Sequence, residues 1–113
     1  MEGLTRESIA HRMAEVLTEL KLDVNMPSLM DYFVADELSQ LKESRVVRWF
    51  NLQTAQLTSG GILVAVEMHP TGALLRIKQV RRNRFWNVRF NDAVIFQRLT
   101  PEEQAVLFAK EYA

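Results

Sequence analysis

The stretch that most constrains the fold is residues 62–96, where apolar side chains alternate along extended segments separated by turn residues. Residues 69–72 contain a proline and a glycine and suit a tight reversal. If Met68 lies opposite Ala73, the apolar side chains of both strands share one face of a sheet. A second reversal is expected at residues 82–83, since asparagine tolerates the left-handed backbone that a short hairpin loop requires. The pattern therefore predicts three strands joined by two hairpins.

The expected register divides the side chains of these strands between two faces. It places Ile77 opposite Val64 on one neighbouring strand and opposite Val88 on the other. Trp86 then falls on the apolar face, with a structural role, and Phe85 falls on the opposite, basic face.

A fourth strand is predicted after a reversal at residues 91–92. Residues 93–98 have apolar side chains on both sides of the extended chain, which is typical of a strand covered on both faces. The sequence thus predicts a four-stranded antiparallel meander over about residues 62–98.

Two helices are expected before this sheet and one after it. Thr5 is a helix cap, and the apolar positions that follow have the spacing of an amphipathic helix over residues 6–21. Pro27 or Ser28 begins a second predicted helix, whose wide apolar stripe comprises Leu29, Met30, Phe33, Val34, Leu38 and Leu41. Thr100, followed by a proline and two glutamates, predicts a short C-terminal helix that ends near Tyr112.

Residues 44–57 fit either a third helix or a strand at the sheet edge, because neither periodicity prevails. With this segment left open, the fold class is α+β: two N-terminal helices, the meander and the C-terminal helix. A chain of 113 residues is most simply one domain, residues 1–113.

Composition excludes several classes of protein. The chain has no cysteine, so disulfides and thiolate zinc sites are excluded. No apolar run reaches the length of a membrane span, and the acidic N-terminus does not resemble a signal peptide, so we expect a cytoplasmic protein without membrane contact.

Enzymatic signals are weak, and we predict no catalytic residues, no metal site and no cofactor. His11 has Glu7 and Glu15 one helical turn to either side, a pattern more typical of a solvated helix face than of a metal site. His69 lies in a turn. No phosphate-binding loop, dinucleotide motif or nucleophile motif is present, and we identify no motif of a known family.

Charge is distributed unevenly along a chain whose net charge is zero. Residues 60–100 have seven lysines or arginines and only two acids, whereas residues 1–59 have six against nine. The two halves can complement one another, or the basic sheet can bind an anionic partner. The candidate contacts for an anion or a nucleic acid are Arg76, Lys78, Arg81, Arg82, Arg84 and Arg89.

Apolar side chains on the basic face indicate a different kind of partner. A soluble monomer does not normally expose so many of them together, which favours a protein partner or a homodimer. The candidate surface comprises Leu74, Val80, Phe85, Val94 and Phe96.

These features favour a small, non-enzymatic interaction or regulatory domain that acts through a protein partner or a homodimer surface on the sheet. The first alternative is nucleic-acid binding through the basic hairpin, residues 76–89. The second is a cup that encloses a small apolar ligand between sheet and helices.

Overall fold

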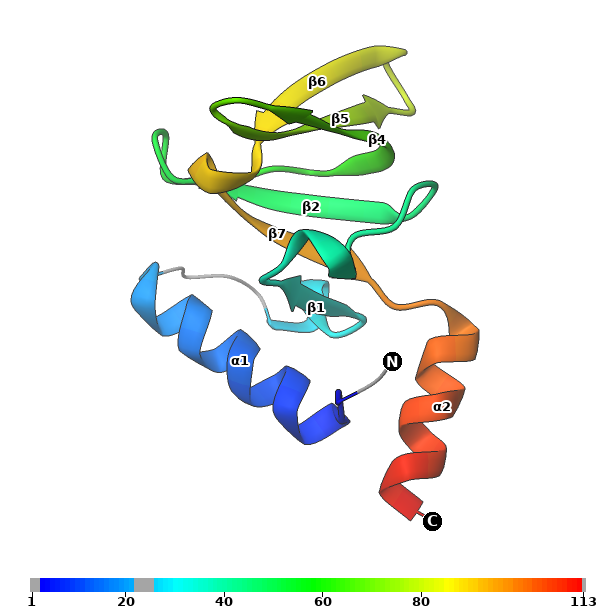
Figure 1. Ribbon diagram of the computed structural model, residues 1–113. Helices are drawn as coiled ribbons and strands as arrows, with labels where there is room; N and C mark the ends of the chain where they lie inside the picture. Colours follow the sequence, from blue (N-terminus) through cyan, green and yellow to red (C-terminus); the bar gives the residue numbers. More distant parts are fainter. Residues whose placement is uncertain (1–2, 22–25, 113) are drawn as a thin grey trace. The chain divides into compact units, whose positions relative to one another are not determined.

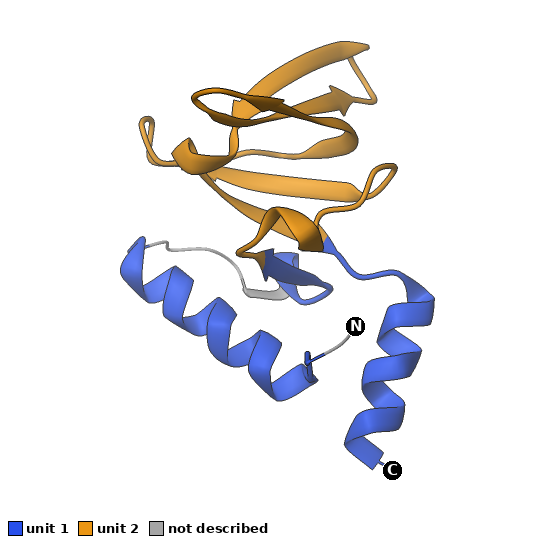
Figure 2. Ribbon diagram, viewed as in Figure 1, with its two compact units in different colours: residues 1–34, 98–113 blue, residues 35–97 orange. Residues whose placement is uncertain are grey.

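The computed structural model describes residues 3–21 and 26–112, and its contacts divide the chain into two compact units. Unit 1 comprises residues 1–34 and 98–113, and unit 2 comprises residues 35–97 (Figure 2). The described residues form two α-helices and a seven-stranded antiparallel sheet, so the α+β class and the antiparallel sheet are confirmed. Two N-terminal helices and a four-stranded meander, however, were wrong predictions.

Unit 1 contains both α-helices, and each begins at the cap that the sequence predicts. In α1 (Arg6–Glu19), the Thr5 hydroxyl accepts a hydrogen bond from the Ser8 amide, and the Ser8 hydroxyl accepts one from the Thr5 amide. In α2 (Pro101–Tyr112), Thr100 and Glu103 exchange the same pair of bonds at 3.0 and 3.1 Å. The buried side chains of this unit include Met13, Val16, Leu29 and Leu107.

The predicted second helix is replaced by η1 (Met26–Leu29), strand β1 (Tyr32–Ala35) and η2 (Leu38–Gln40). Phe33, Val34 and Ala35 are consecutive and all buried. One face of a helix cannot bury three consecutive side chains, whereas a strand covered on both faces can. Of the wide apolar stripe that we interpreted as a helix, Phe33 and Val34 therefore belong to a strand, whereas Leu29 and Leu38 belong to the flanking 3-10 turns.

Unit 2 is a curled antiparallel sheet in which the strands follow the order β7-β2-β4-β5-β6, with β3 paired to β2 (Figure 1). The strands are β2 (Val46–Asn51), β3 (Gln56–Leu57), β4 (Gly61–His69), β5 (Gly72–Gln79), β6 (Arg84–Arg89) and β7 (Ala93–Arg98), whose last residue belongs to unit 1. The side chains buried in unit 2 include Val47, Trp49, Phe50, Leu63, Leu75, Ile77, Ile95 and Phe96.

The segment that fitted either a helix or an edge strand forms β2, and β2 is an interior strand, because β4 and β7 pair with its two sides. Its last residue, Asn51, accepts hydrogen bonds on Oδ1 from the amides of Gln53 and Thr54, at 2.8 and 3.2 Å. Ala55 has a left-handed φ of 55°. This turn sends the chain back as β3.

The β4–β5 register begins as predicted and then shifts at a bulge. Met68 lies opposite Ala73, but the register shifts between Leu63 and Ala65, so Ile77 pairs with Leu63 instead of Val64. Leu63 is consequently fully buried, whereas Val64 is 39% exposed. A bulge also increases the local twist, which helps the sheet to curl.

The β5–β6 hairpin has a longer loop than predicted. Ile77 lies opposite Trp86, two residues away from the expected partner Val88, because residues 80–83 all belong to the turn. Asn83 has the expected left-handed φ, 48°. A shift of two residues leaves every side chain on its predicted face, since side chains alternate with a period of two.

The fourth predicted strand exists, but β7 pairs with β2 and not with β6. The 3-10 turn η3 (Phe90–Asp92) replaces the predicted two-residue reversal, and the chain that follows it pairs with β2. Ile95, Phe96 and Gln97 are consecutive on β7 and all buried, so this strand is covered on both faces, as its apolar pattern predicts.

Across residues 3–21 and 26–112, neither helix combines the length and apolar character needed to cross a membrane.

Candidate functional site

The β5–β6 hairpin is the most basic part of the chain. Residues 72–89 contain six lysines or arginines and no aspartate or glutamate. All six side chains are exposed or half-buried, and none forms an ion pair with another residue in the described part of the chain. They are Arg76, Lys78, Arg81, Arg82, Arg84 and Arg89, the same six that the sequence indicates as anion contacts. Like charges so close together create a local positive potential that attracts anions.

On one face of the hairpin, cations surround Phe85. Lys78 lies opposite Phe85 in the register, and the Lys78 ammonium is 5.9 Å from the centre of the ring. The guanidinium of Arg76 lies 4.7 Å from the same centre. Phe85 is nevertheless 48% exposed, so this face presents an aromatic ring and two cations together.

The structure separates the residues of the predicted partner surface. Leu74 and Phe85 share a face of the hairpin, and Val80 is exposed in its turn. Val94 and Phe96 lie on β7, three strands away from β5 in the sheet order, and Phe96 is fully buried. The five residues therefore do not form one surface, and those on the hairpin lie among the cations.

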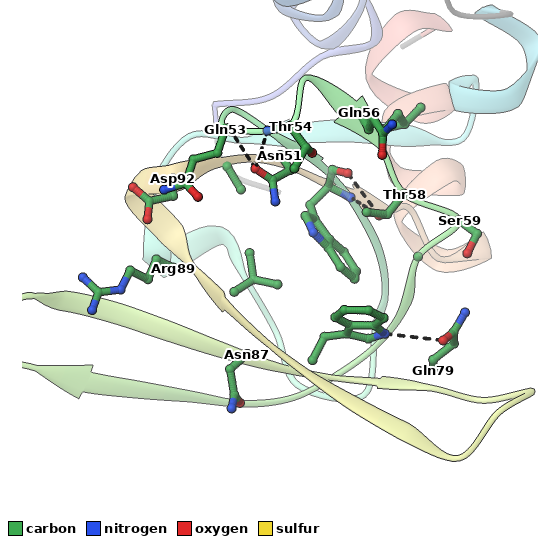
Figure 3. A pocket seen from close by; sticks show the side chains of 16 residues that line it. Asn51, Gln53, Thr54, Gln56, Thr58, Ser59, Gln79, Asn87, Arg89 and Asp92 are labelled. Atoms are coloured by element: carbon green, nitrogen blue, oxygen red, sulfur yellow. Dashed lines mark hydrogen bonds between the residues drawn. The ribbon is translucent and has the colours of Figure 1, made fainter.

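The opposite face of the hairpin lines a groove of about 660 Å³ (Figure 3). Strands β2 and β6 are separated by β4 and β5 in the sheet order, yet both line this groove, because the sheet curls. Its side chains are mainly aromatic, amide and hydroxyl groups, with Arg89 and Asp92 as the only charged residues in the lining. The lining includes Trp49, Asn51, Gln53, Gln56, Thr58, Ser59, Gln79, Trp86 and Val88.

Trp86 is the aromatic side chain most available in this groove. It shares a face with Ile77, as predicted, but it lies on the edge strand and remains 46% exposed, whereas Trp49 is only 5% exposed. The indole Nε1 of Trp86 donates to Oε1 of Gln79 at 3.4 Å (Figure 3).

The wall that β2 and the following loop provide is held by several hydrogen bonds. Thr58 donates from its amide and its hydroxyl to the Trp49 carbonyl, at 2.9 and 3.0 Å. The Arg48 guanidinium donates from Nε to the Thr58 carbonyl at 3.0 Å. Gly60 has a φ of 93°, and a Cβ there would lie 2.4 Å from the Val47 carbonyl oxygen, so only glycine fits.

Sequence reasoning found the cations and missed the groove. Gln79 and Thr58 are ordinary polar residues whose importance depends on the curl of the sheet. The one available signal was the turn chemistry of Asn51, which predicts a reversal after β2 and hence a loop near the hairpin.

Other parts of the described chain have fewer features of a binding site. Unit 1 contains an apolar cavity of about 280 Å³ between residues of α1, α2 and the segment around Leu29. The His11 Nε2 atom lies 3.3 Å from the Glu15 carboxylate on the exposed surface of α1. Among residues 3–21 and 26–112, no three histidine or acidic side chains form a group that would hold a metal ion.

Comparison with known proteins gives no match to any family model, any curated protein or any solved structure.

Proposed function

We propose that this chain is a non-enzymatic binding domain that takes single-stranded nucleic acid on its β5–β6 hairpin. The observation that supports this proposal is the combination of six cations that form no ion pair with a described residue and an exposed aromatic side chain on each face of the hairpin. Cations neutralise phosphates, and aromatic rings stack on unpaired bases.

A single strand is favoured over a duplex by the position of the aromatic rings. Phe85 and Trp86 are adjacent in sequence, so they point to opposite faces of β6, and both are about half exposed. Bases in a duplex are already stacked and paired, whereas an unpaired base offers a free ring face to Trp86; the Phe85 ring instead lies beneath the cations of Arg76 and Lys78. A flexible strand can also follow the edge of a narrow hairpin.

The test is the salt dependence of binding. We expect affinity for a single-stranded oligonucleotide to fall steeply with salt, with a slope of up to about −4 in log K against log salt if all six cations contact phosphates. A triple variant with Arg81→Ala, Arg82→Ala and Arg84→Ala should weaken binding and reduce this slope by about 2.

A matched control removes three cations from other parts of the chain, the half-buried Arg12 and the exposed Lys21 and Lys42: Arg12→Ala, Lys21→Ala and Lys42→Ala. Both triple variants change the net charge by the same amount, so nonspecific attraction falls equally. Equal losses in the two variants, or a salt slope that the hairpin substitutions leave unchanged, would contradict the proposal.

A protein partner is the second candidate, because β6 ends the strand order and one side of its backbone pairs with no described strand. An extended segment of another protein can add to such an edge. A second copy of this chain is a poor fit there, since antiparallel pairing of two β6 strands brings Arg84 of each copy near Arg89 of the other. This candidate therefore requires an acidic partner segment.

Sedimentation separates self-association from the other cases: a monomer at high concentration excludes a homodimer. An acidic peptide that displaces the oligonucleotide and binds more tightly than the oligonucleotide does would favour a protein partner. The ligand cup between sheet and helices stays a prediction.

A further inference from the structure

The groove in unit 2 offers hydrogen-bonding groups that a phosphate-binding surface does not need. Gln53 and Gln56 line it, and their side chains form no hydrogen bond with any residue that the structure describes. Gln79 accepts one bond, from Trp86, and retains its amide donors. These amides both donate and accept, as the edges of nucleobases do.

Trp86 supplies a platform beside one of these amides, that of Gln79. Its ring is 46% exposed in a position where the alternation of β6 directs it toward the groove, while the Asn87 side chain points away (Figure 3). The bond to Gln79 orients the indole and keeps an amide at its edge. Stacking on a held ring loses less conformational entropy than stacking on a mobile one.

A cation stands next to this pair. Arg84 lies directly opposite Gln79 in the β5–β6 register and on the same face as Trp86. An indole, an amide and a guanidinium therefore adjoin one another at the end of one hairpin. These three groups are complementary to a ligand in which a planar ring has a hydrogen-bonding edge and is joined to a phosphate.

The facing wall is preformed. Thr58 is bonded to Trp49 and Arg48, and Gly60 packs too closely on β2 for any other residue. Unless this loop unfolds locally, the groove keeps its width when a ligand enters.

We infer that this groove is a base pocket, in which an unpaired nucleobase stacks on Trp86, hydrogen-bonds to Gln79 and places its phosphate on Arg84. The inference rests on the proposed function and deepens it: the cations hold the strand, and the groove holds one of its bases. Phe85 lies on the other face of the hairpin. It belongs to the cationic surface that binds the phosphates of the strand and not to the base pocket.

The experiment compares two probes of equal length and charge: a ten-nucleotide single strand, and the same phosphodiester chain with abasic sugars at every position. Wild-type protein should bind the base-bearing strand about tenfold more tightly, which is within the range for stacking one base. Trp86→Ala should remove this preference and leave the affinity for the abasic strand unchanged. Phe85→Ala is the matched control and should retain the preference.

Further arms separate the possible outcomes. Trp86→Phe should keep most of the preference, since a ring remains, and Gln79→Ala should reduce it several-fold. A mononucleotide that binds as tightly as the strand would show that the ligand is a free nucleotide, and would overturn the proposed strand. Thermal unfolding of each variant shows whether it is folded.

Failure of the inference is distinguishable from failure of the proposed function. If both strands bind equally to wild-type protein, or if Phe85→Ala removes the preference, the base pocket is wrong and the cationic surface stands. If neither strand binds, both are wrong.

Discussion

The two tryptophans of unit 2 line the same groove but differ in how far their strands bury them. Trp49 lies on β2, which pairs with β3, β4 and β7, and it is 5% exposed. Trp86 lies on β6, which pairs only with β5 among the described strands, and it is 46% exposed. The pattern of a strand determines which side chains share a face, but the position of the strand in the sheet determines whether that face is buried.

The same comparison extends to the polar residues at the two ends of the sheet. On β7, Gln97 is fully buried, and its side-chain oxygen and nitrogen are both hydrogen-bonded. At the β6 end, Gln79 is partly exposed and makes one long hydrogen bond, 3.4 Å. We therefore regard the β2–β7 region as the scaffold of unit 2, and the β5–β6 hairpin remains the proposed binding surface.

Truncation of the two tryptophans should give the largest difference in stability between the scaffold and the hairpin. Trp49→Ala should lower the free energy of unfolding by about 3–5 kcal/mol, because it removes a large buried ring. Trp86→Ala should cost about 1 kcal/mol or less, since half of its ring is already exposed to water. Urea unfolding of both variants gives the difference, and comparable losses would contradict the division.

The glycine in the groove wall tests whether that wall is preformed. Gly60→Ala should cost about 2–4 kcal/mol, through a left-handed backbone and a clash with the Val47 carbonyl oxygen. Gly3→Ala is the control: Gly3 also has a positive φ, 73°, but no atom lies within 4 Å of the added Cβ. A loss at Gly3 as large as that at Gly60 would show that the backbone angle alone is responsible and that the wall is not tightly packed.

The two glutamines sharpen the comparison further. Gln97→Met keeps the side-chain volume but leaves the Lys42 amide and the Gln40 carbonyl without their partner, which should cost about 2 kcal/mol. Gln79→Met should change stability by about 0.5 kcal/mol or less, because water replaces its one long bond. Equal effects in thermal unfolding would mean that the hairpin belongs to the scaffold.

Local patterns predicted the elements whose cause is local. The caps at Thr5 and Thr100 and the reversal at residues 69–72 depend on neighbouring residues alone, and all three are confirmed. The prediction of a helix through Phe33 failed because an apolar stripe is compatible with a helix and with a strand buried on both faces. Only the rest of the fold separates these two cases.

The strand order and the bulge could not be predicted from local sequence patterns, for a different reason. The alternation of β7 is the same whether it pairs with β6 or with β2, so its partner cannot be deduced from its own side chains. The bulge at Val64 exchanges the faces of Leu63 and Val64 without any glycine or proline to mark it. The groove depends on both features, which is why the sequence indicated the cations of the hairpin but not the pocket beside them.

The smallest expected effect concerns the arginines of the hairpin, whose proposed role is binding alone. The triple variant with Arg81→Ala, Arg82→Ala and Arg84→Ala should unfold within about 0.5 kcal/mol of wild-type protein, because these exposed side chains form no ion pair with a described residue. At low salt the variant should even be slightly more stable, since it relieves repulsion among like charges. That gain should disappear near physiological salt, where the Debye length is about 8 Å.

Urea unfolding at low and at physiological salt measures both effects, and the Arg12, Lys21 and Lys42 triple variant is again the control. A loss above about 1 kcal/mol in the hairpin variant would mean that the arginines hold the structure together. Their concentration on one edge would then need no ligand to explain it. Unchanged stability together with weakened binding would instead assign these charges to the partner, since the arginines would then contribute to binding and not to folding.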